Sequence, residues 1–167
     1  MESGHLTMQV GNSTCKNWQI ATIFVAAYAC MTGATAQNDC KSPVYLTLDT
    51  GHMGVAPLVA DVLRRNKVKV TFFAANEPTQ TGDGSLGNAW GTWWKAMAAD
   101  GHDFATHTYD HVYWRGDIKG VQPTFRMRPS AGAFAGREFT WDASKYCGQL
   151  NQASQRLQDF TGKQSLP

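Results

Sequence analysis

The feature of this chain that most constrains its fold is a regular alternation of strand-like and helix-like segments. Runs rich in β-branched and aromatic residues are typical of strands, whereas apolar residues spaced three and four apart are typical of helices. Strand, helix, strand, helix and strand are predicted in turn over residues 44–48, 57–66, 68–74, 89–99 and 102–106. Strands joined in this way by helices are parallel, with right-handed crossovers. The sequence therefore predicts an α/β fold with parallel strands and the helices outside.

The second half of the chain is less regular. Between Tyr113 and Thr140 no clean period is found, and several glycines and prolines favour a long irregular excursion. From Asp142 to Phe160 the apolar spacing predicts a third helix, ending near Gly162. The order of the elements is expected in an α/β sheet or in a barrel. Three strands and three helices are about half of an ordinary α/β barrel, so in the second case the chain would form the N-terminal half of a (β/α) barrel.

Composition and charge narrow the classes of partner. The 167 residues are 43% hydrophobic and 17% charged, which fits one globular domain and excludes an intrinsically disordered chain. The formal net charge is +2, and no basic run is present that would favour nucleic acid or an anionic membrane. The sequence does not define the oligomeric state.

The N-terminal region has the pattern of a secretory signal. Ile20 to Met31 is an uninterrupted run of apolar or small residues, preceded by Lys16 and followed by the small-x-small sequence Ala34-Thr35-Ala36. This pattern predicts a signal peptide over residues 1–36, a domain over 37–167 and an exported protein, periplasmic or secreted. A start at Met8, an uncleaved anchor and a buried core helix are the alternatives. No other membrane contact is expected.

Removal of that segment would leave two cysteines, Cys40 and Cys147. In an exported domain they are a candidate disulfide, and two buried thiols are the alternative. A redox or structural secreted protein, in which these cysteines matter and the histidines do not, is the function that would follow from them.

Polar residues follow the predicted strands at two places. Asp49 ends the first strand, and His107 and His111 come just after the third. The carboxyl ends of parallel strands meet at one edge, where active sites of α/β proteins are built. Histidines four residues apart on a helical turn face one way and can bind one divalent cation, with zinc the default. The alternatives are an aspartate that caps the following turn and a solvated pair of histidines.

Three blocks of sequence carry a family resemblance. They are Val44-Tyr45-Leu46-Thr47-Leu48-Asp49-Thr50-Gly51, Val70-Thr71-Phe72-Phe73-Ala74 and Gly101-His102-Asp103-Phe104-Ala105-Thr106-His107-Thr108-Tyr109-Asp110-His111. In order and spacing the chain resembles the polysaccharide deacetylase family of carbohydrate esterases, from about Val44 to Pro167. The resemblance implies a distorted (β/α) barrel. It also implies a metal-dependent hydrolase that removes N- or O-acetyl groups from chitin-like polymers or peptidoglycan.

The resemblance also implies roles for individual residues. Asp49 matches the general base, and His107 and His111 match the metal ligands. The family has a second aspartate where this chain has Thr50, so Thr50 is expected to be a weak ligand at most. The ligand position of the family's second aspartate would then be filled by His52, by Asp110 or by water.

The family pattern continues beyond the matched blocks, into an arginine–proline motif and a general-acid histidine. Residues 157–167 resemble the approach to the arginine–proline motif, so the domain is expected to be incomplete at its C-terminus. A truncated, inactive homologue or a glycan-binding fragment is therefore the alternative function.

Aromatic residues suggest where a sugar could bind. Tyr113 and Trp114 follow the histidine motif and are the predicted substrate-binding residues. An aromatic stripe with helical spacing is interpreted as core; it consists of Trp90, Trp93, Trp94 and Met97. Glu77 and Asp83, in the glycine-rich segment, are interpreted as solvated turn residues.

Overall fold

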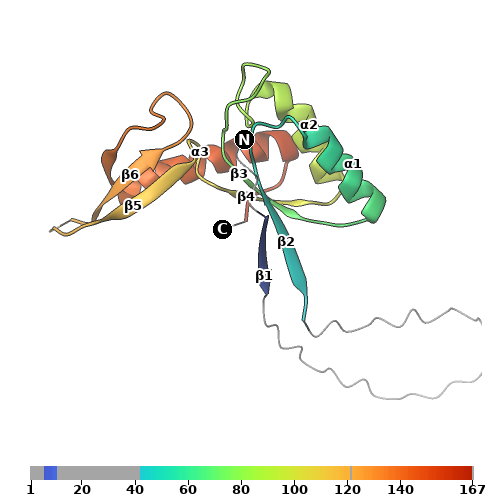
Figure 1. The fold of residues 1–167 in the computed structure, drawn as a ribbon, viewed down its shortest axis with the longest axis horizontal. Coiled ribbons are helices and arrows are strands. Elements are labelled where there is room, and N and C mark those ends of the chain that lie inside the picture. The colour runs from blue at the N-terminus through green and yellow to red at the C-terminus, as the bar shows by residue number, and fades with distance from the viewer. Residues whose placement is uncertain (1–5, 11–41, 121, 167) are drawn as a thin grey trace, which may run out of the picture.

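The computed structural model describes residues 6–10, 42–120 and 122–166 and contains two sheets (Figure 1). The first has four strands in the order β1-β2-β3-β4, and the second has three in the order β5-β6-β7. Helices α1 and α2 lie beside the first sheet, and the long helix α3 runs alongside both sheets.

The first sheet contains the predicted parallel strands. β2 (Val44–Asp49) pairs in parallel with β3 (Thr71–Ala74), and β3 pairs in parallel with β4 (Asp103–Thr106). The connections contain the helices α1 (Ala56–Asn66) and α2 (Gly91–Ala99), the latter preceded by the short 3-10 helix η1 (Asn88–Trp90). The α/β fold with parallel strands is therefore confirmed.

A further strand pairs at the edge of this sheet. β1 (Leu6–Val10) runs antiparallel to β2, from Leu6 opposite Leu48 to Val10 opposite Val44. This strand was not predicted from the sequence, and it falls within the predicted signal peptide. The apolar run 20–31 lies outside the described residues, so the signal peptide and the export of the protein remain predictions.

Aromatic side chains form the centre of the core. The Phe72 ring makes edge contacts with Trp93 and Trp94, with centroids 5.5 and 5.7 Å apart, and it stacks on Phe104 at 6.1 Å. Trp94 is fully buried, and its indole N–H donates to the backbone oxygen of Ser85 at 2.8 Å. Trp90 and Trp93 are partly buried against the same cluster, which confirms that the aromatic stripe is core.

The helices end where their sequences predict. Gly101 follows α2 with a φ of 87°, and Gly162 follows α3 (Ala143–Thr161) with a φ of 68°. Glycine adopts this left-handed conformation without a steric penalty, so it terminates a helix readily. Asp142 caps the start of α3, since its carboxylate accepts the backbone N–H of Lys145 at 2.8 Å.

The prediction of an irregular excursion from Tyr113 to Thr140 is wrong. This part of the chain forms the antiparallel strands β5 (Val112–Ile118), β6 (Thr124–Pro129) and β7 (Phe139–Asp142). The glycines and prolines that suggested irregularity lie largely at turns and strand ends, and Gly116, with a φ of 145°, lies at a shift in the β5–β6 register. The long helix α3 packs along this second sheet, where Trp114 contacts Tyr146.

The half-barrel remains a prediction. In the described residues the strands form two separate sheets and not one continuous, curved sheet. The segment after α3 returns to the first sheet, where the Leu166 N–H donates to the Phe104 oxygen at 2.7 Å beside β4. Within the described residues, every helix is too short or too polar to serve as a membrane span.

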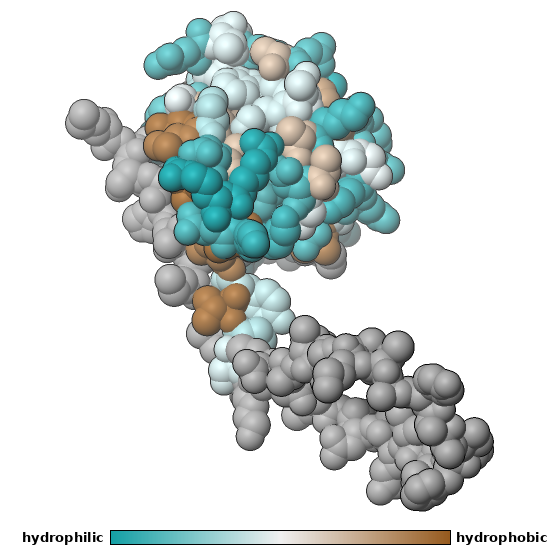
Figure 2. Space-filling model, turned by 90° about the vertical axis from the view of Figure 1, so that its right-hand side faces the viewer, coloured by the Kyte–Doolittle hydropathy of each residue, from teal (hydrophilic) through white to brown (hydrophobic). Residues whose placement is uncertain are grey.

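The end of the molecule at which α1 lies is seen face-on in Figure 2. Hydrophilic side chains predominate there, with separate hydrophobic ones between them. Exposed apolar residues of this region include Val55, Leu58 and Val62. Scattered exposure of this kind is ordinary on a folded protein.

A buried histidine predicts how stability depends on pH. His102 is 1% exposed, and its Nδ1 accepts the Val70 N–H at 3.2 Å, which requires an unprotonated Nδ1. Burial, and then the charge of Lys69, lower its pKa from 6.5. As the pH falls below about 6.5, the unfolded chain binds a proton there that the folded chain does not. We therefore expect the free energy of unfolding to fall, by at most about 1.4 kcal/mol per pH unit for this one group.

Urea unfolding between pH 7.5 and 5.5 measures this dependence. His102→Asn keeps a hydrogen-bond acceptor and removes the titrating ring, so its pH dependence should be shallower. The control is His52→Asn at an exposed histidine, which should leave the slope unchanged. Equal slopes for the wild type and His102→Asn would contradict this account.

Candidate active site at the carboxyl ends of the parallel strands

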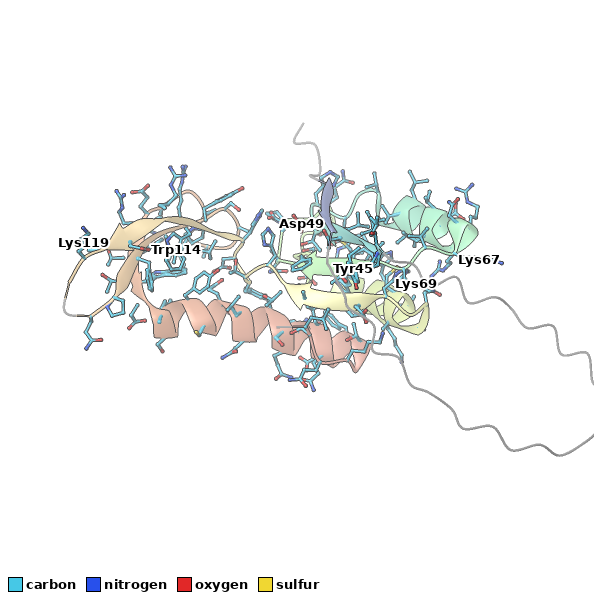
Figure 3. All side chains as sticks on the ribbon, turned by 90° about the horizontal axis from the view of Figure 1, so that it is seen from below. Tyr45, Asp49, Lys67, Lys69, Trp114 and Lys119 are labelled. Atoms are coloured by element: carbon cyan, nitrogen blue, oxygen red, sulfur yellow. The ribbon has the colours of Figure 1, made fainter. Side chains whose placement is uncertain are left out.

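The predicted site residues gather at one edge of the first sheet. Asp49 is the last residue of β2, and His107 follows β4 directly. Figure 3 shows Asp49 at the end of the parallel sheet that faces the second sheet, with Lys67 and Lys69 toward the opposite end. The topology therefore places Asp49 and the histidine motif at the same edge of the sheet.

The two histidines lie side by side, but not on a helical turn. Their ring centroids are 4.7 Å apart. Thr108 and His111 have φ values of 62° and 47°, both left-handed, so the expected helical turn is wrong. The buried Thr108 hydroxyl stabilises the turn, since it accepts the Val112 N–H at 2.7 Å and donates to the His107 oxygen at 2.5 Å.

Helix α3 holds this turn from the other side. Gln149 is 8% exposed, and its side chain makes two hydrogen bonds to Asp110: its oxygen accepts the Asp110 N–H at 2.7 Å, and its amide donates to the carboxylate at 2.9 Å. Its backbone oxygen accepts the Tyr109 N–H at 3.1 Å. Three bonds from one side chain and its backbone thus fix the segment between the two histidines.

Thr50 has a structural role that the sequence analysis did not find. Its hydroxyl accepts the Ala75 N–H at 2.8 Å and donates to the Ala75 oxygen at 3.1 Å. Because Ala75 is fully buried, these bonds satisfy backbone groups that water does not reach. The hydroxyl joins the ends of β2 and β3, an arrangement that does not favour the predicted role of a weak metal ligand.

Glu77 is the site residue that the sequence analysis missed. Its carboxylate oxygen Oε1 contacts Nδ1 of His111, and the two side chains are only 17% and 23% exposed. The interpretation of Glu77 as a solvated turn residue is therefore wrong. Its position just beyond the carboxyl end of β3 was the available signal, because side chains after parallel strands meet at this edge.

Burial and three neighbouring side chains determine the pKa of His107. Burial is the largest influence and lowers the pKa of His107 below 6.5. The carboxylate of Asp49 opposes this, His111 lowers the pKa further, and Glu77 again opposes. Asp49 is thus near enough to influence the imidazole, and burial favours the neutral form of His107.

The other residues considered as ligands are engaged elsewhere. The Asp110 carboxylate accepts from Gln149 at 2.9 Å, and His52 is an exposed loop residue whose Nδ1 accepts the Gly54 N–H at 3.1 Å. Imidazole and carboxylate donors of the kind present here suit zinc and similar divalent cations. Within the described part of the chain, however, no three Asp, Glu, His or Cys side chains are already grouped as a cation would require.

The two predicted substrate-binding aromatics lie in different environments. Both residues are 49% exposed, but their neighbours differ: the centroid of the Tyr113 ring lies 5.2 Å from that of His111. Trp114 packs on Phe125 with centroids 4.2 Å apart, and Figure 3 shows it between the second sheet and α3, away from Asp49. Tyr113 therefore belongs to the site, and Trp114 anchors the second sheet.

The disulfide between Cys40 and Cys147 remains a prediction. Cys147 is an exposed free thiol on α3, and Cys40 lies outside the described residues.

Comparisons with known proteins show which sequences and structures this chain is similar to. The family model described as Polysaccharide deacetylase matches residues 36–166. A chitin disaccharide deacetylase of Vibrio alginolyticus is 37% identical over 94 residues, which cover 56% of this chain and 21% of that protein. PdaA of Bacillus subtilis, a family 4 carbohydrate esterase, has 22% identity and a TM-score of 0.44 over 71% of this chain and 38% of its own. The chain thus spans about a fifth of the length of the curated relative.

The two hydrogen bonds between the Thr50 hydroxyl and the backbone of Ala75 predict how a substitution at position 50 changes stability. Thr50→Val keeps the shape of the side chain and removes both bonds to Ala75, so the buried Ala75 N–H loses its partner. The expected cost is about 1–3 kcal/mol in the free energy of unfolding, measured by urea denaturation. Thr92→Val, at an exposed position of α2, is the matched control and should change it by no more than about 0.5 kcal/mol. Equal stabilities would contradict the structural role of the hydroxyl.

Proposed function

This chain belongs to the polysaccharide deacetylase family, and on that premise we propose that it is a hydrolase that removes acetyl groups from an N- or O-acetylated polysaccharide. The observation that carries the proposal is the juxtaposition of Asp49 with the His107–His111 pair at the carboxyl edge of the parallel strands. The name of the Vibrio relative favours a chitin-like polymer as the substrate.

We further propose that a divalent cation, zinc by default, binds at His107 and His111. The two rings lie side by side, and the carboxylates of Asp49 and Glu77 are close enough to act on them. The lowered pKa of His107 leaves a nitrogen lone pair available at neutral pH. When bound, such an ion supplies polarisation of the acetyl carbonyl and a lower pKa for water.

The protein's own residues would carry out the proton transfer and binding steps. Asp49 is exposed at its strand end, where its carboxylate can accept a proton from the attacking water as general base. The exposed ring of Tyr113, beside His111, is placed to stack on a sugar. An exported location, where such polymers occur, is part of the proposal.

A second candidate is glycan binding without turnover. The exposed Tyr113 ring next to the histidines supports it, because stacking on a sugar face needs no catalysis. The two candidates differ in whether acetate is released.

The proposed role of Asp49 predicts a loss of activity in Asp49→Asn. With chitin oligomers as substrate and excess zinc, we expect acetate release to fall by about 10²–10⁴, since the amide cannot accept the proton. Asp61→Asn, at an exposed aspartate of α1, is the control and should retain wild-type activity. Equal rates for Asp49→Asn and the wild type would contradict the general-base role. Binding of the oligomers by the wild type without acetate would favour the second candidate.

A further inference from the structure

We propose that Glu77 is a positioning residue of this site, which holds His111 with its proton on Nδ1 so that Nε2 is presented to a divalent cation. The inference rests on the proposed function for the identity of the ligand. It concerns a residue in the connection between β3 and α2, outside the motif that contains the two histidines.

The contact between Glu77 and His111 is the first observation behind this inference. Glu77 Oε1 lies against Nδ1 of His111, and both side chains are largely shielded from water. A neutral imidazole carries one proton, and a carboxylate acceptor at Nδ1 keeps that proton there. Nε2 then holds the lone pair. Carboxylate–histidine pairs of this kind set the tautomer and the ring orientation of metal-binding histidines.

The backbone around Glu77 is held from two directions. The Glu77 N–H donates to the hydroxyl of Ser85 at 2.9 Å, and its carbonyl accepts the Ser85 N–H at 2.8 Å. The preceding residue, Asn76, donates its N–H to the oxygen of Tyr109 at 2.7 Å, and its side chain reaches the Tyr109 hydroxyl at 3.1 Å. The segment carrying Glu77 is thus bonded to the turn between the histidines.

The uncharged residue at position 50 fits the same arrangement. The hydroxyl of Thr50 bonds to both backbone groups of Ala75, two residues before Glu77. Position 50 therefore contributes no charge, but it anchors the segment that brings a carboxylate to the site. Glu77 also acts on His107, so its charge reaches both imidazoles.

The partners of Glu77 do not suggest another role. Among the described residues its ion-pair partner is His111, and no lysine or arginine is paired with it. A carboxylate that is mostly shielded from water needs such a partner, because an unpaired buried charge is costly.

A test without metal isolates the positioning role. Long-range ¹H–¹⁵N spectra of the metal-free protein at pH 8 report which nitrogen of His111 carries the proton. We expect the Nδ1–H form to predominate in the wild type and to lose that predominance in Glu77→Ala. The control, Glu138→Ala at an exposed glutamate, should leave the His111 signals unchanged. An unchanged tautomer in Glu77→Ala would overturn the inference.

Titration calorimetry with Zn²⁺ provides the second readout. Loss of a carboxylate partner of a ligating histidine weakens metal binding by about 10–100-fold, so Glu77→Ala should bind zinc that much more weakly than the wild type and Glu138→Ala. Glu77→Gln retains a hydrogen-bond acceptor without the charge, so its zinc affinity should lie between those of the wild type and Glu77→Ala. If Glu77→Ala does not fold, Glu77→Gln replaces it in this comparison. Equal zinc affinities for the wild type and both Glu77 variants would overturn the inference.

The two readouts separate this inference from the proposed function. A wild type that does not bind zinc would contradict the metal-dependent deacetylase, whereas the tautomer of His111 would still decide the role of Glu77. A wild type that binds zinc and releases acetate, with Glu77 variants that do the same and keep the tautomer, would overturn the role of Glu77 alone.

Discussion

The site depends on hydrogen bonds that join the carboxyl ends of the parallel strands to one another. Thr50 bonds the end of β2 to Ala75 after β3, and Asn76 bonds the same segment to Tyr109 after β4. The bonds of Thr50 and of the Asn76 N–H satisfy backbone groups where ladder pairing stops, and the bond from the Asn76 amide to the Tyr109 hydroxyl joins two side chains. Gln149 of α3 adds three bonds to the histidine turn.

The second sheet extends this support in another direction. Ser130, just after β6, donates its N–H and hydroxyl to the backbone oxygen of His111 at 3.1 and 3.0 Å. His111 is therefore held by Glu77 at its ring and by the β6 end at its backbone. Because α3 packs against the second sheet and also carries Gln149, it couples that sheet to the site. Strand β6, which was not predicted from the sequence, thus helps to hold His111, which was predicted as a site residue.

The parallel strands and helices could be predicted because their signals are local. Apolar runs, helix-ending glycines and the aromatic stripe of α2 all depend on residues near one another in sequence. The second sheet was missed because its glycines and prolines at turns and strand ends obscured the alternation of strands such as β6. Asp49 and the histidines could be found because they end predicted strands. The position of Glu77 just beyond β3 was a usable signal, but its contact with His111 was not, because the two residues are 34 apart in sequence. The bonds of Thr50 to Ala75 could not be predicted either, because these residues are 25 apart.

Charge bears on whether a threonine at position 50 is compatible with the proposed cation site. Burial lowers the pKa of His107 and favours its neutral form, and the negative charge near the two histidines comes from the carboxylates of Asp49 and Glu77. Two carboxylates can balance one divalent cation, whereas a third would add repulsion at an edge that is only partly open to water. A hydroxyl at position 50 avoids that repulsion and supplies the two bonds to Ala75 that a carboxylate, which cannot donate, would not reproduce. The neutral residue therefore favours both the geometry and the charge of the arrangement with Glu77.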